Sequence, residues 1–250
     1  MKVVGLVSGG KDSCYNLIQC VKNGHELVAL LNLYPPIDSD GDELDSYMYQ
    51  TVGHQALESY SKAMDLPLFR HPITGKPLVQ EMNYEHSEEN DEVEDLYRAL
   101  KTIQEKIHFD AISVGAILSN YQRTRAENVC KRLGIKMLCY LWERDQLVLL
   151  KEMIDEGIEA IIIKVAAMGL NPHDHLGKTL AEMYPILLEL NQKYGINVCG
   201  EGGEYETLTL DCPLFKNKLV IEDKEIIMHS EDAFAPVGYL KPLKVKVIPK

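Results

Sequence analysis

The sequence lacks the features that would mark a membrane protein or a disulfide-bonded one. It contains no run of about 18 apolar residues, which a membrane-spanning helix requires. Its six cysteines include no C-x-x-C pair and favour reduced cytosolic thiols over a disulfide framework. The N-terminus has neither a secretory nor an Arg-rich transit pattern. These absences predict a cytoplasmic protein with no membrane partner.

Positive charge is also scarce. The chain has 26 Lys and Arg against 38 Asp and Glu, which gives a formal net charge of −12. A broad nucleic-acid surface needs a basic patch, so we expect no direct contact with nucleic acid, although a local patch is compatible with this total. Internal repeats and low-complexity tracts are missing too. The apolar residues, 46% of the chain, can form a substantial core.

What is present is a strand–turn–helix pattern at the N-terminus. Residues 3–7 form an apolar run, and residues 14–21 carry apolar side chains at the spacing of one helix face. Between them lies the turn Ser8-Gly9-Gly10-Lys11-Asp12-Ser13. Such a turn aims backbone N–H groups and the positive end of a helix dipole at one point, and its glycines let a phosphate approach. Lys11 adds a charge, Ser8 and Ser13 add hydroxyls, and Asp12 can hold a Mg²⁺ ion that bridges phosphates.

Two better-known phosphate loops do not fit this turn. The dinucleotide pattern G-x-G-x-x-G does not occur. The pattern G-x-x-x-x-G-K-[ST] fails because Asp12 stands at its last position and Gly5 falls inside the predicted strand. The turn instead resembles the Ser-Gly-Gly-x-Asp-Ser signature of the PP-loop ATP pyrophosphatases. That resemblance implies ATP, cleaved to AMP and pyrophosphate. The alternative is an ordinary strand–helix turn with two glycines.

The remaining pattern predicts an α/β fold. Strands alternate with helices over residues 1–140, which indicates a Rossmann-like (HUP-type) parallel sheet with helices on both faces. Residues 141–250 predict a smaller α+β C-terminal domain, in which residues 219–221 and 225–228 form a hairpin. We interpret the acidic run at 88–95 as the solvated start of a helix. Ligands in such sheets bind outside the carboxyl ends of the strands, where the turn lies.

Further stretches resemble a narrower family. Residues 115–125, 141–144 and 200–207 closely resemble the diphthine–ammonia ligases, and residues 45–48 and 232–236 extend the resemblance over essentially the whole chain. It implies that the carboxylate of diphthine, a modified histidine on translation elongation factor 2, attacks the α-phosphate of ATP. Ammonia, which arrives as ammonium, then displaces AMP from the acyl-adenylate to give the amide.

The resemblance also implies roles for particular residues. Donors and cations around the α-phosphate provide most of such catalysis, so we expect Lys11, Asp12 and Arg123 to be catalytic and Asp12 to hold Mg²⁺. Arg123 and Arg125 are two residues apart and point in different directions on a regular helix, so at most one contacts phosphate unless Arg123 lies in the preceding turn. Each is otherwise a surface arginine. The expected ATP contacts are Ser8, Gly9, Gly10, Lys11, Asp12, Ser13, Gly115 and Arg125.

A second cluster, residues 200–207, is interpreted as the diphthine site. Diphthine carries a quaternary ammonium, which suits an aromatic face and nearby carboxylates, and these would also attract an ammonium ion. One side chain must then span both clusters, so the second must fold back beside the first. The alternative is a glycine-rich surface turn with solvated glutamates. The expected substrate-binding residues are Glu201, Gly202, Gly203, Glu204, Tyr205, Glu206 and Thr207.

Two other functions and two minor motifs stay open at this point. A PP-loop enzyme that adenylates a tRNA base would want a basic surface and, for thiolation, paired cysteines. A non-catalytic module would bind the nucleotide without reaction. His173 and His175 favour a loop that caps a helix over a metal site. Cys14 favours a buried thiol over sulfur chemistry.

Overall fold

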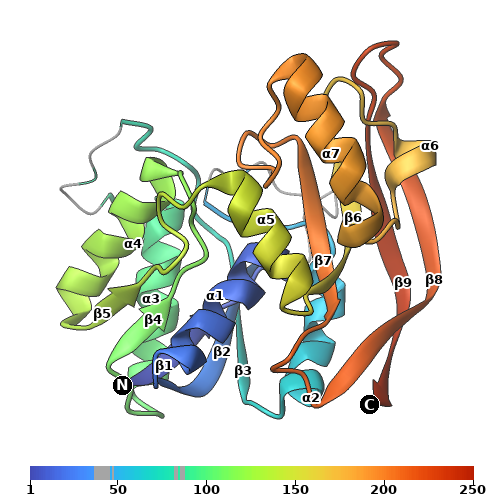
Figure 1. The fold of residues 1–250 in the computed structure, drawn as a ribbon. Helices are drawn as coiled ribbons and strands as arrows, with labels where there is room; N and C mark the ends of the chain where they lie inside the picture. Colours follow the sequence, from blue (N-terminus) through green and yellow to red (C-terminus); the bar gives the residue numbers. More distant parts are fainter. Residues whose placement is uncertain (37–45, 47, 82–83, 85–87) are drawn as a thin grey trace.

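The computed structural model describes residues 1–36, 46, 48–81, 84 and 88–250 (Figure 1). Of the stretch at 45–48, only Ser46 and Met48 therefore fall among the described residues. Across these ranges, no helix has the length and hydropathy needed to cross a membrane.

The first sheet has five parallel strands in the order β3-β2-β1-β4-β5. Neighbouring side chains on a strand point to opposite faces, so Leu30 packs with Leu17 of α1, whereas Leu31 packs with Leu96 of α3. Helices thus cover both faces, and the Rossmann-like prediction is confirmed. The elements are β1 Lys2–Leu6, α1 Lys11–Lys22, β2 Glu26–Tyr34, α2 Tyr60–Met64, β3 Leu68–Pro72, α3 Glu92–Gln104, β4 Ala111–Ser113, α4 Asn120–Leu133 and β5 Lys136–Leu138.

The acidic start of α3 is buried, so the interpretation of residues 88–95 as a solvated helix start is wrong for most of its carboxylates. Asp91, Glu92, Glu94 and Asp95 are all buried. Asp95 accepts hydrogen bonds from the backbone N–H groups of Thr74 and Gly75, each at 2.8 Å. Burial alone would raise the pKa of Asp95, but these bonds and Arg98 hold it below its ordinary value. The carboxylates fasten the preceding loop to the helix.

The second sheet is antiparallel and has the strand order β7-β6-β9-β8. The hairpin predicted inside residues 219–228 is wrong, because β8 runs through this stretch as one long strand. Its charged middle stays paired, with Asp223 opposite Lys244. The elements are α5 Gln146–Asp155, β6 Glu159–Val165, α6 Pro172–His175, α7 Leu180–Tyr194, β7 Tyr205–Asp211, β8 Asn217–Ser230 and β9 Val237–Pro249.

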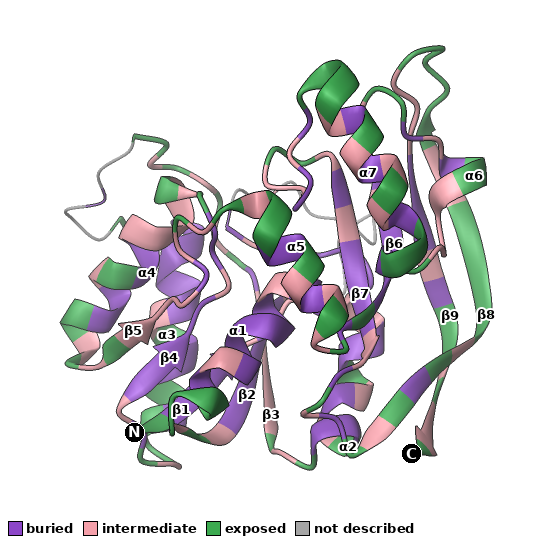
Figure 2. Ribbon diagram, in the orientation of Figure 1, coloured by how far each residue is buried: buried purple, intermediate pink, exposed green. Residues whose placement is uncertain are grey.

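The two sheets share one hydrophobic core. Leu17 on α1 packs in the same cluster as Leu149 on α5 and Leu187 on α7, and in Figure 1 α5 lies across α1. Leu141, where the boundary between domains 1–140 and 141–250 was predicted, is buried in this cluster as well. That boundary stays a prediction. Figure 2 shows that α1 and β7 consist largely of buried residues.

Candidate active site

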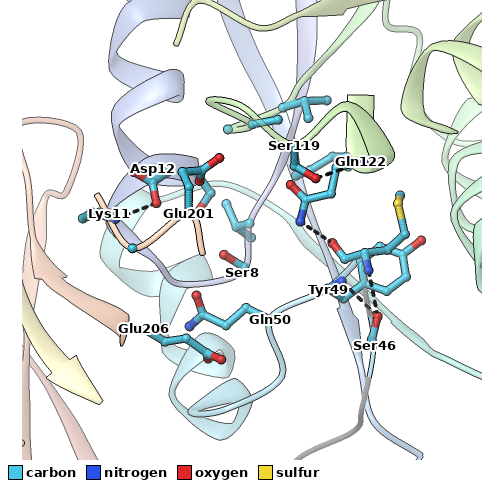
Figure 3. A pocket seen from close by; sticks show the side chains of 18 of the residues that line it. Ser8, Lys11, Asp12, Ser46, Tyr49, Gln50, Ser119, Gln122, Glu201 and Glu206 are labelled. Atoms are coloured by element: carbon cyan, nitrogen blue, oxygen red, sulfur yellow. Dashed lines mark hydrogen bonds and ion pairs between the residues drawn. The ribbon is translucent and has the colours of Figure 1, made fainter. Parts of the chain in front are cut away.

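A cavity of about 450 Å³ opens at the carboxyl ends of β1 and β4, where the strand order of the first sheet reverses. This is the place where open α/β sheets bind ligands. One wall is apolar and includes Leu31, Leu33 and Met48, and the other is formed by the turn at residues 8–13 and the stretch 199–207 (Figure 3). The two clusters singled out in the sequence therefore share one cavity.

The glycine turn is tied to β7. Gly9 has a φ of +90°, a conformation that favours glycine, and its carbonyl accepts bonds from the Thr209 N–H at 2.8 Å and the Tyr60 hydroxyl at 3.1 Å. The Ser8 hydroxyl accepts a bond from the Gly10 N–H at 3.3 Å. These contacts fix the backbone at the start of α1.

Thr207 caps α1 from a distance of 196 residues in the sequence. Gly10 precedes the helix and offers no side chain, and the Lys11 N–H donates instead to Thr207 Oγ1 at 3.0 Å. Thr207 also accepts a bond through its carbonyl from Gln50 at 3.1 Å. The stretch 200–207 was expected to lie beside the turn, and this bond shows how it does.

The side chain of Lys11 is buried at the junction of the two clusters. Its Nζ donates to Asp12 Oδ2 at 2.8 Å and to the Cys199 carbonyl at 2.5 Å, and it lies 5.2 Å from the centre of the Tyr205 ring. Burial by itself lowers the pKa of Lys11, but Asp12 and Tyr205 more than offset this and raise it above its ordinary value. Lys11 is therefore a permanent cation.

Asp12 and Glu201 present carboxylates side by side in the cavity (Figure 3). Asp12 Oδ1 is buried and has no hydrogen-bond partner among the described residues. Glu201 is held by the Leu118 N–H at 2.8 Å. Burial raises the pKa of both groups, and the negative charge of Asp12 raises that of Glu201 further.

These two carboxylates fit a Mg²⁺ ion that also binds phosphate. Mg²⁺ in phosphate sites takes one or two carboxylates and completes its shell with phosphate oxygens and water. Asp12 Oδ1 is a buried oxygen that lacks a donor, which suits such a ligand. In the part of the chain that the structure describes, no set of three or more His, Cys, Asp or Glu side chains could hold a metal unaided.

Gly115 lies against the glycine turn. A Cβ atom at this position would stand 2.7 Å from the Ser13 nitrogen and 2.8 Å from the Asp12 carbonyl carbon. The close approach of the two backbones therefore requires glycine here. Gly115 and Ser13 both line the cavity.

Some residues of the second cluster, 200–207, line the cavity, and others stabilise the loop to which they belong. Glu201, Gly203, Tyr205, Glu206 and Thr207 line the cavity, whereas Gly202 and Glu204 are not among its walls. Glu204 closes the loop by accepting bonds from the Asn197 N–H at 2.7 Å and the Gly202 N–H at 2.8 Å. Glu206 forms an ion pair with Lys164 at 3.4 Å.

Tyr205 has a structural contact at each end. It is buried, its hydroxyl donates to the Val198 carbonyl at 2.6 Å, and the Lys11 ammonium lies over its ring. The Lys11 ammonium therefore already lies beside the aromatic face of Tyr205.

The two arginines lie outside the cavity walls. Arg125 is completely buried, stacks 3.3 Å from the Tyr121 ring centre and donates to the carbonyls of Val79 and Glu81. These polar contacts all go to protein groups, and Arg125 is not among the residues that line the cavity, so its contact with ATP stays a prediction. Arg123 points elsewhere, as expected from the spacing, and its guanidinium lies 4.4 Å from the Trp142 ring centre. Its catalytic role stays a prediction.

Sequence reasoning missed part of the cavity wall. Gln122 donates to the Met48 carbonyl at 3.2 Å and so joins α4 to the segment after residue 45. The signal for the α4 residues was available, because Ser119, Gln122 and Ala126 have the spacing of one helix face. The missed residues between 46 and 50 had no such signal, because they lie in a segment without regular secondary structure. The missed polar residues are Ser46, Tyr49, Gln50, Ser119 and Gln122.

Of the two minor motifs, Cys14 is a buried thiol as expected, whereas His173 and His175 belong to a helix rather than to a loop that caps one. His173 and His175 lie in the short helix α6, where Asn171 caps the His173 N–H and His175 accepts a bond from the Asn171 N–H, each at 2.8 Å. Cys14 is buried on α1, and burial raises its pKa to about 11, so it is a poor nucleophile at neutral pH.

The fold and the cavity define the class of the molecule, a Rossmann-like α/β protein with a ligand site at the switch point of its parallel sheet. Two family models match the chain, the diphthamide synthase N-terminal domain over residues 1–137 and the diphthamide synthase C-terminal domain over residues 145–241. The chain belongs to the diphthine–ammonia ligase family, and the prediction of an enzyme of this family is confirmed.

Relatives match nearly the whole chain. The diphthine–ammonia ligase of Danio rerio is 59% identical over 98% of this chain and 96% of its own length. That of Homo sapiens is 59% identical over 98% of this chain and 92% of its own length. The Schizosaccharomyces pombe protein of the same name is 56% identical over 96% of this chain, which corresponds to 39% of its own length.

Proposed function

We propose that the chain converts diphthine on translation elongation factor 2 to diphthamide, using ATP and ammonium and releasing AMP and pyrophosphate. The observation that carries the proposal is the union of the two clusters in one cavity. The Lys11 N–H bonds Thr207, and the Lys11 ammonium bonds the Cys199 carbonyl, so the phosphate-binding turn and the acidic stretch are adjacent. The diphthine–ammonia ligase relatives support the same reaction.

The nucleotide occupies the side of the cavity formed by the first sheet. The apolar wall at Leu31, Leu33 and Met48 suits the adenine ring, and the turn at 8–13 with the start of α1 suits the phosphates. Asp12 and Glu201 hold Mg²⁺, which when bound neutralises negative charge on the phosphates. Lys11 keeps a positive charge beside these carboxylates.

The diphthine side chain enters beside the acidic stretch. Glu206 faces the cavity and attracts its quaternary ammonium. Glu204 and Tyr205 are proposed to hold the loop in shape rather than to contact the substrate, because their polar atoms bind loop backbone. Gly202 and Gly203 let the loop turn tightly, and Gly203 has a φ of +82°.

The reaction proceeds in two displacements. An oxygen of the diphthine carboxylate bonds to the α-phosphorus while the bond to pyrophosphate breaks, giving an acyl-adenylate. Ammonium, attracted by the carboxylates, loses one proton to solvent, its nitrogen attacks the acyl carbon, and the nitrogen of the adduct then loses a second proton to solvent. The C–O bond to AMP then breaks, AMP leaves with that oxygen, and the amide remains. N–H donors at the turn stabilise the charge that develops on the α-phosphate.

The test is to identify the nucleotide product. The purified chain is mixed with ATP, ammonium and elongation factor 2 that carries diphthine, and the nucleotides are separated by chromatography. We expect AMP in equal amount to the amide formed, and none when the factor lacks diphthine. ADP as the product would contradict the proposal. AMP formation that requires tRNA instead would favour the tRNA-modifying alternative, and ATP binding without any product would favour a non-catalytic module.

A further inference from the structure

Large apolar side chains surround the acidic loop at the cavity. We name residues 197–204 the mouth loop, and Leu118, Leu147, Val148 and Met168 the apolar rim. The exposed fractions of the rim residues are 47%, 40%, 59% and 46%, in that order. Isolated exposed apolar residues are ordinary, but several around one opening indicate an interaction surface.

Each rim residue lies on a segment that is hydrogen-bonded to the mouth loop. The N–H of Leu118 itself donates to Glu201 at 2.8 Å. Gln146, which precedes Leu147, accepts a bond from the Val198 N–H at 2.7 Å. These residues come from the segment before α4 and from the first turn of α5.

The opposite side of the mouth loop is tied to the end of β6. Ala166 donates its N–H to the Glu204 carbonyl at 2.9 Å, and Met168 follows two residues later. The rim therefore approaches the mouth loop from three separate segments. Figure 2 shows the first turn of α5 as an exposed part of the surface.

We propose that the apolar rim docks the body of the protein that carries diphthine. This inference rests on the proposed function, in which the reacting group is a side chain of a folded protein. Such a side chain enters the cavity only if the protein surface around it covers the rim, because the rim is continuous with the cavity wall through Glu201. The acidic cavity attracts the cationic side chain, and the uncharged rim contacts the protein surface that surrounds this side chain.

The small size of the rim matches an enzyme that must release its product. Four apolar side chains supply only a small part of a protein interface, and small interfaces are typical of transient complexes. Their contacts form before the reaction and persist through it, so they contribute to the binding of the protein substrate and little to the chemical step. The rim is thus expected to affect KM and to leave kcat unchanged.

The experiment compares Val148→Ser, Met168→Ser and the double variant with Leu243→Ser. Leu243 is 52% exposed but lies on β9 five residues beyond Gly238, which pairs with β6 at the cavity end. At about 3.4 Å per residue, it is roughly 17 Å further along the sheet, so it serves as a matched control. AMP formation is measured against the concentration of diphthine-bearing elongation factor 2 at saturating ATP, and then against ATP.

We expect each single variant to raise KM for the factor about fivefold and the double variant to multiply these effects, because the two residues lie on separate segments. kcat and KM for ATP stay unchanged, and Leu243→Ser behaves like the parent chain. Elongation factor 2 without diphthine should inhibit the parent chain competitively, and the double variant should require a higher concentration of it.

An unchanged KM for the factor in the double variant would overturn the docking proposal while the parent chain remains active. A double variant that shifts the sedimentation of the chain, with KM unchanged, would assign the rim to self-association and overturn it as well. A parent chain that forms no AMP with the modified factor would overturn both this inference and the proposed function.

Discussion

At the scale of single residues, the site consists of one buried cation among carboxylates. The Lys11 ammonium bonds Asp12, and Asp12 lies beside Glu201. Burial disfavours every one of these charges, yet the attraction between Lys11 and Asp12 keeps Lys11 protonated. Buried charged groups whose pKa values are shifted by burial and by one another are typical of a functional site.

Replacing Asp12 by Asn tests its role as a metal ligand. We expect AMP formation to fall on the order of 100-fold, the size typical for one group that stabilises developing charge, and to require more Mg²⁺. Thermal unfolding of the variant shows whether the fold is kept. Glu222→Gln is the control, since Glu222 pairs with Lys244 on the second sheet, outside the cavity walls, and should not change AMP formation. Near-normal turnover of Asp12→Asn would remove Asp12 from the mechanism.

Replacing Glu201 by Gln tests how far the buried charge of Glu201 destabilises the fold. The pKa of Glu201 in the folded chain is raised above its ordinary value of 4.5. The stability that Glu201 contributes to the fold is therefore fully present below its unfolded pKa and is lost as pH rises through its folded pKa. Gln can still accept the bond from the Leu118 N–H but carries no charge. We expect the variant to gain stability over the parent chain between pH 4 and pH 7.5.

Urea unfolding of both chains at the two pH values measures this gain. The variant should also lose AMP formation, because stability gained at a functional site is usually offset by lost activity. A difference in unfolding free energy that shrinks as the pH rises would show that Glu201 is not the group that burial destabilises.

At the scale of elements, the site depends on the contact between the start of α1 and the start of β7. A helix leaves its first N–H groups without partners, and α1 begins after glycines that cannot cap it. Thr207 supplies the missing acceptor from β7. The same strand accepts a bond from Gln50, so the segment before α2 is joined to the contact.

Replacing Thr207 by Val, which has nearly the same shape, removes this acceptor. The Lys11 N–H is then buried without a partner, which costs about 1–3 kcal/mol of unfolding free energy. We expect Thr207→Ser, which keeps the hydroxyl, to lose less stability and to retain more AMP formation. Denaturant titration and an AMP assay on both variants make the comparison. Equal behaviour of the Ser and Val variants would show that the hydroxyl does not position the turn.

The sequence was informative about elements whose cause is local. The turn at 8–13 follows from its glycines and flanking apolar patterns, and the parallel sheet follows from alternating strands and helices. The cap at Thr207 and the partly buried salt bridge between Glu94 and Arg132 at 2.7 Å could not be predicted, because their partners are distant in sequence. The continuous β8 was missed because its charged middle resembles a turn, whereas charge is common on an exposed edge strand.

The same distinction between local causes and distant partners applies to the candidate site. The cluster at 200–207 was predicted beside the turn from the expectation that one substrate spans both, and the bond between Lys11 and Thr207 confirms that the two are adjacent. The separate roles of Glu201 and Glu204 depend on which backbone N–H each carboxylate meets, and sequence spacing does not contain that information. The stacking of Arg125 on Tyr121 could not be predicted for a similar reason, since Tyr121 looks like an ordinary helix residue.

At the scale of the whole molecule, the second sheet completes the cavity of the first. α1 carries the phosphate-binding turn at its start, and its apolar face is buried by helices of both halves. Residues 199–207 close the cavity from the C-terminal half. In the proposed reaction, a nucleotide and a side chain of another protein meet in this cavity, and an oxygen of that side chain attacks the α-phosphate.

Transfer of an oxygen isotope tests this claim most directly. Elongation factor 2 whose diphthine carboxylate carries ¹⁸O in both oxygens is incubated with the chain, unlabelled ATP and ammonium, and the products are measured by mass spectrometry. The account predicts one ¹⁸O atom in AMP, one in the amide of diphthamide and none in pyrophosphate, because the attacking oxygen stays with the α-phosphate when ammonia displaces AMP. AMP without the label, or the label in released phosphate, would contradict the account.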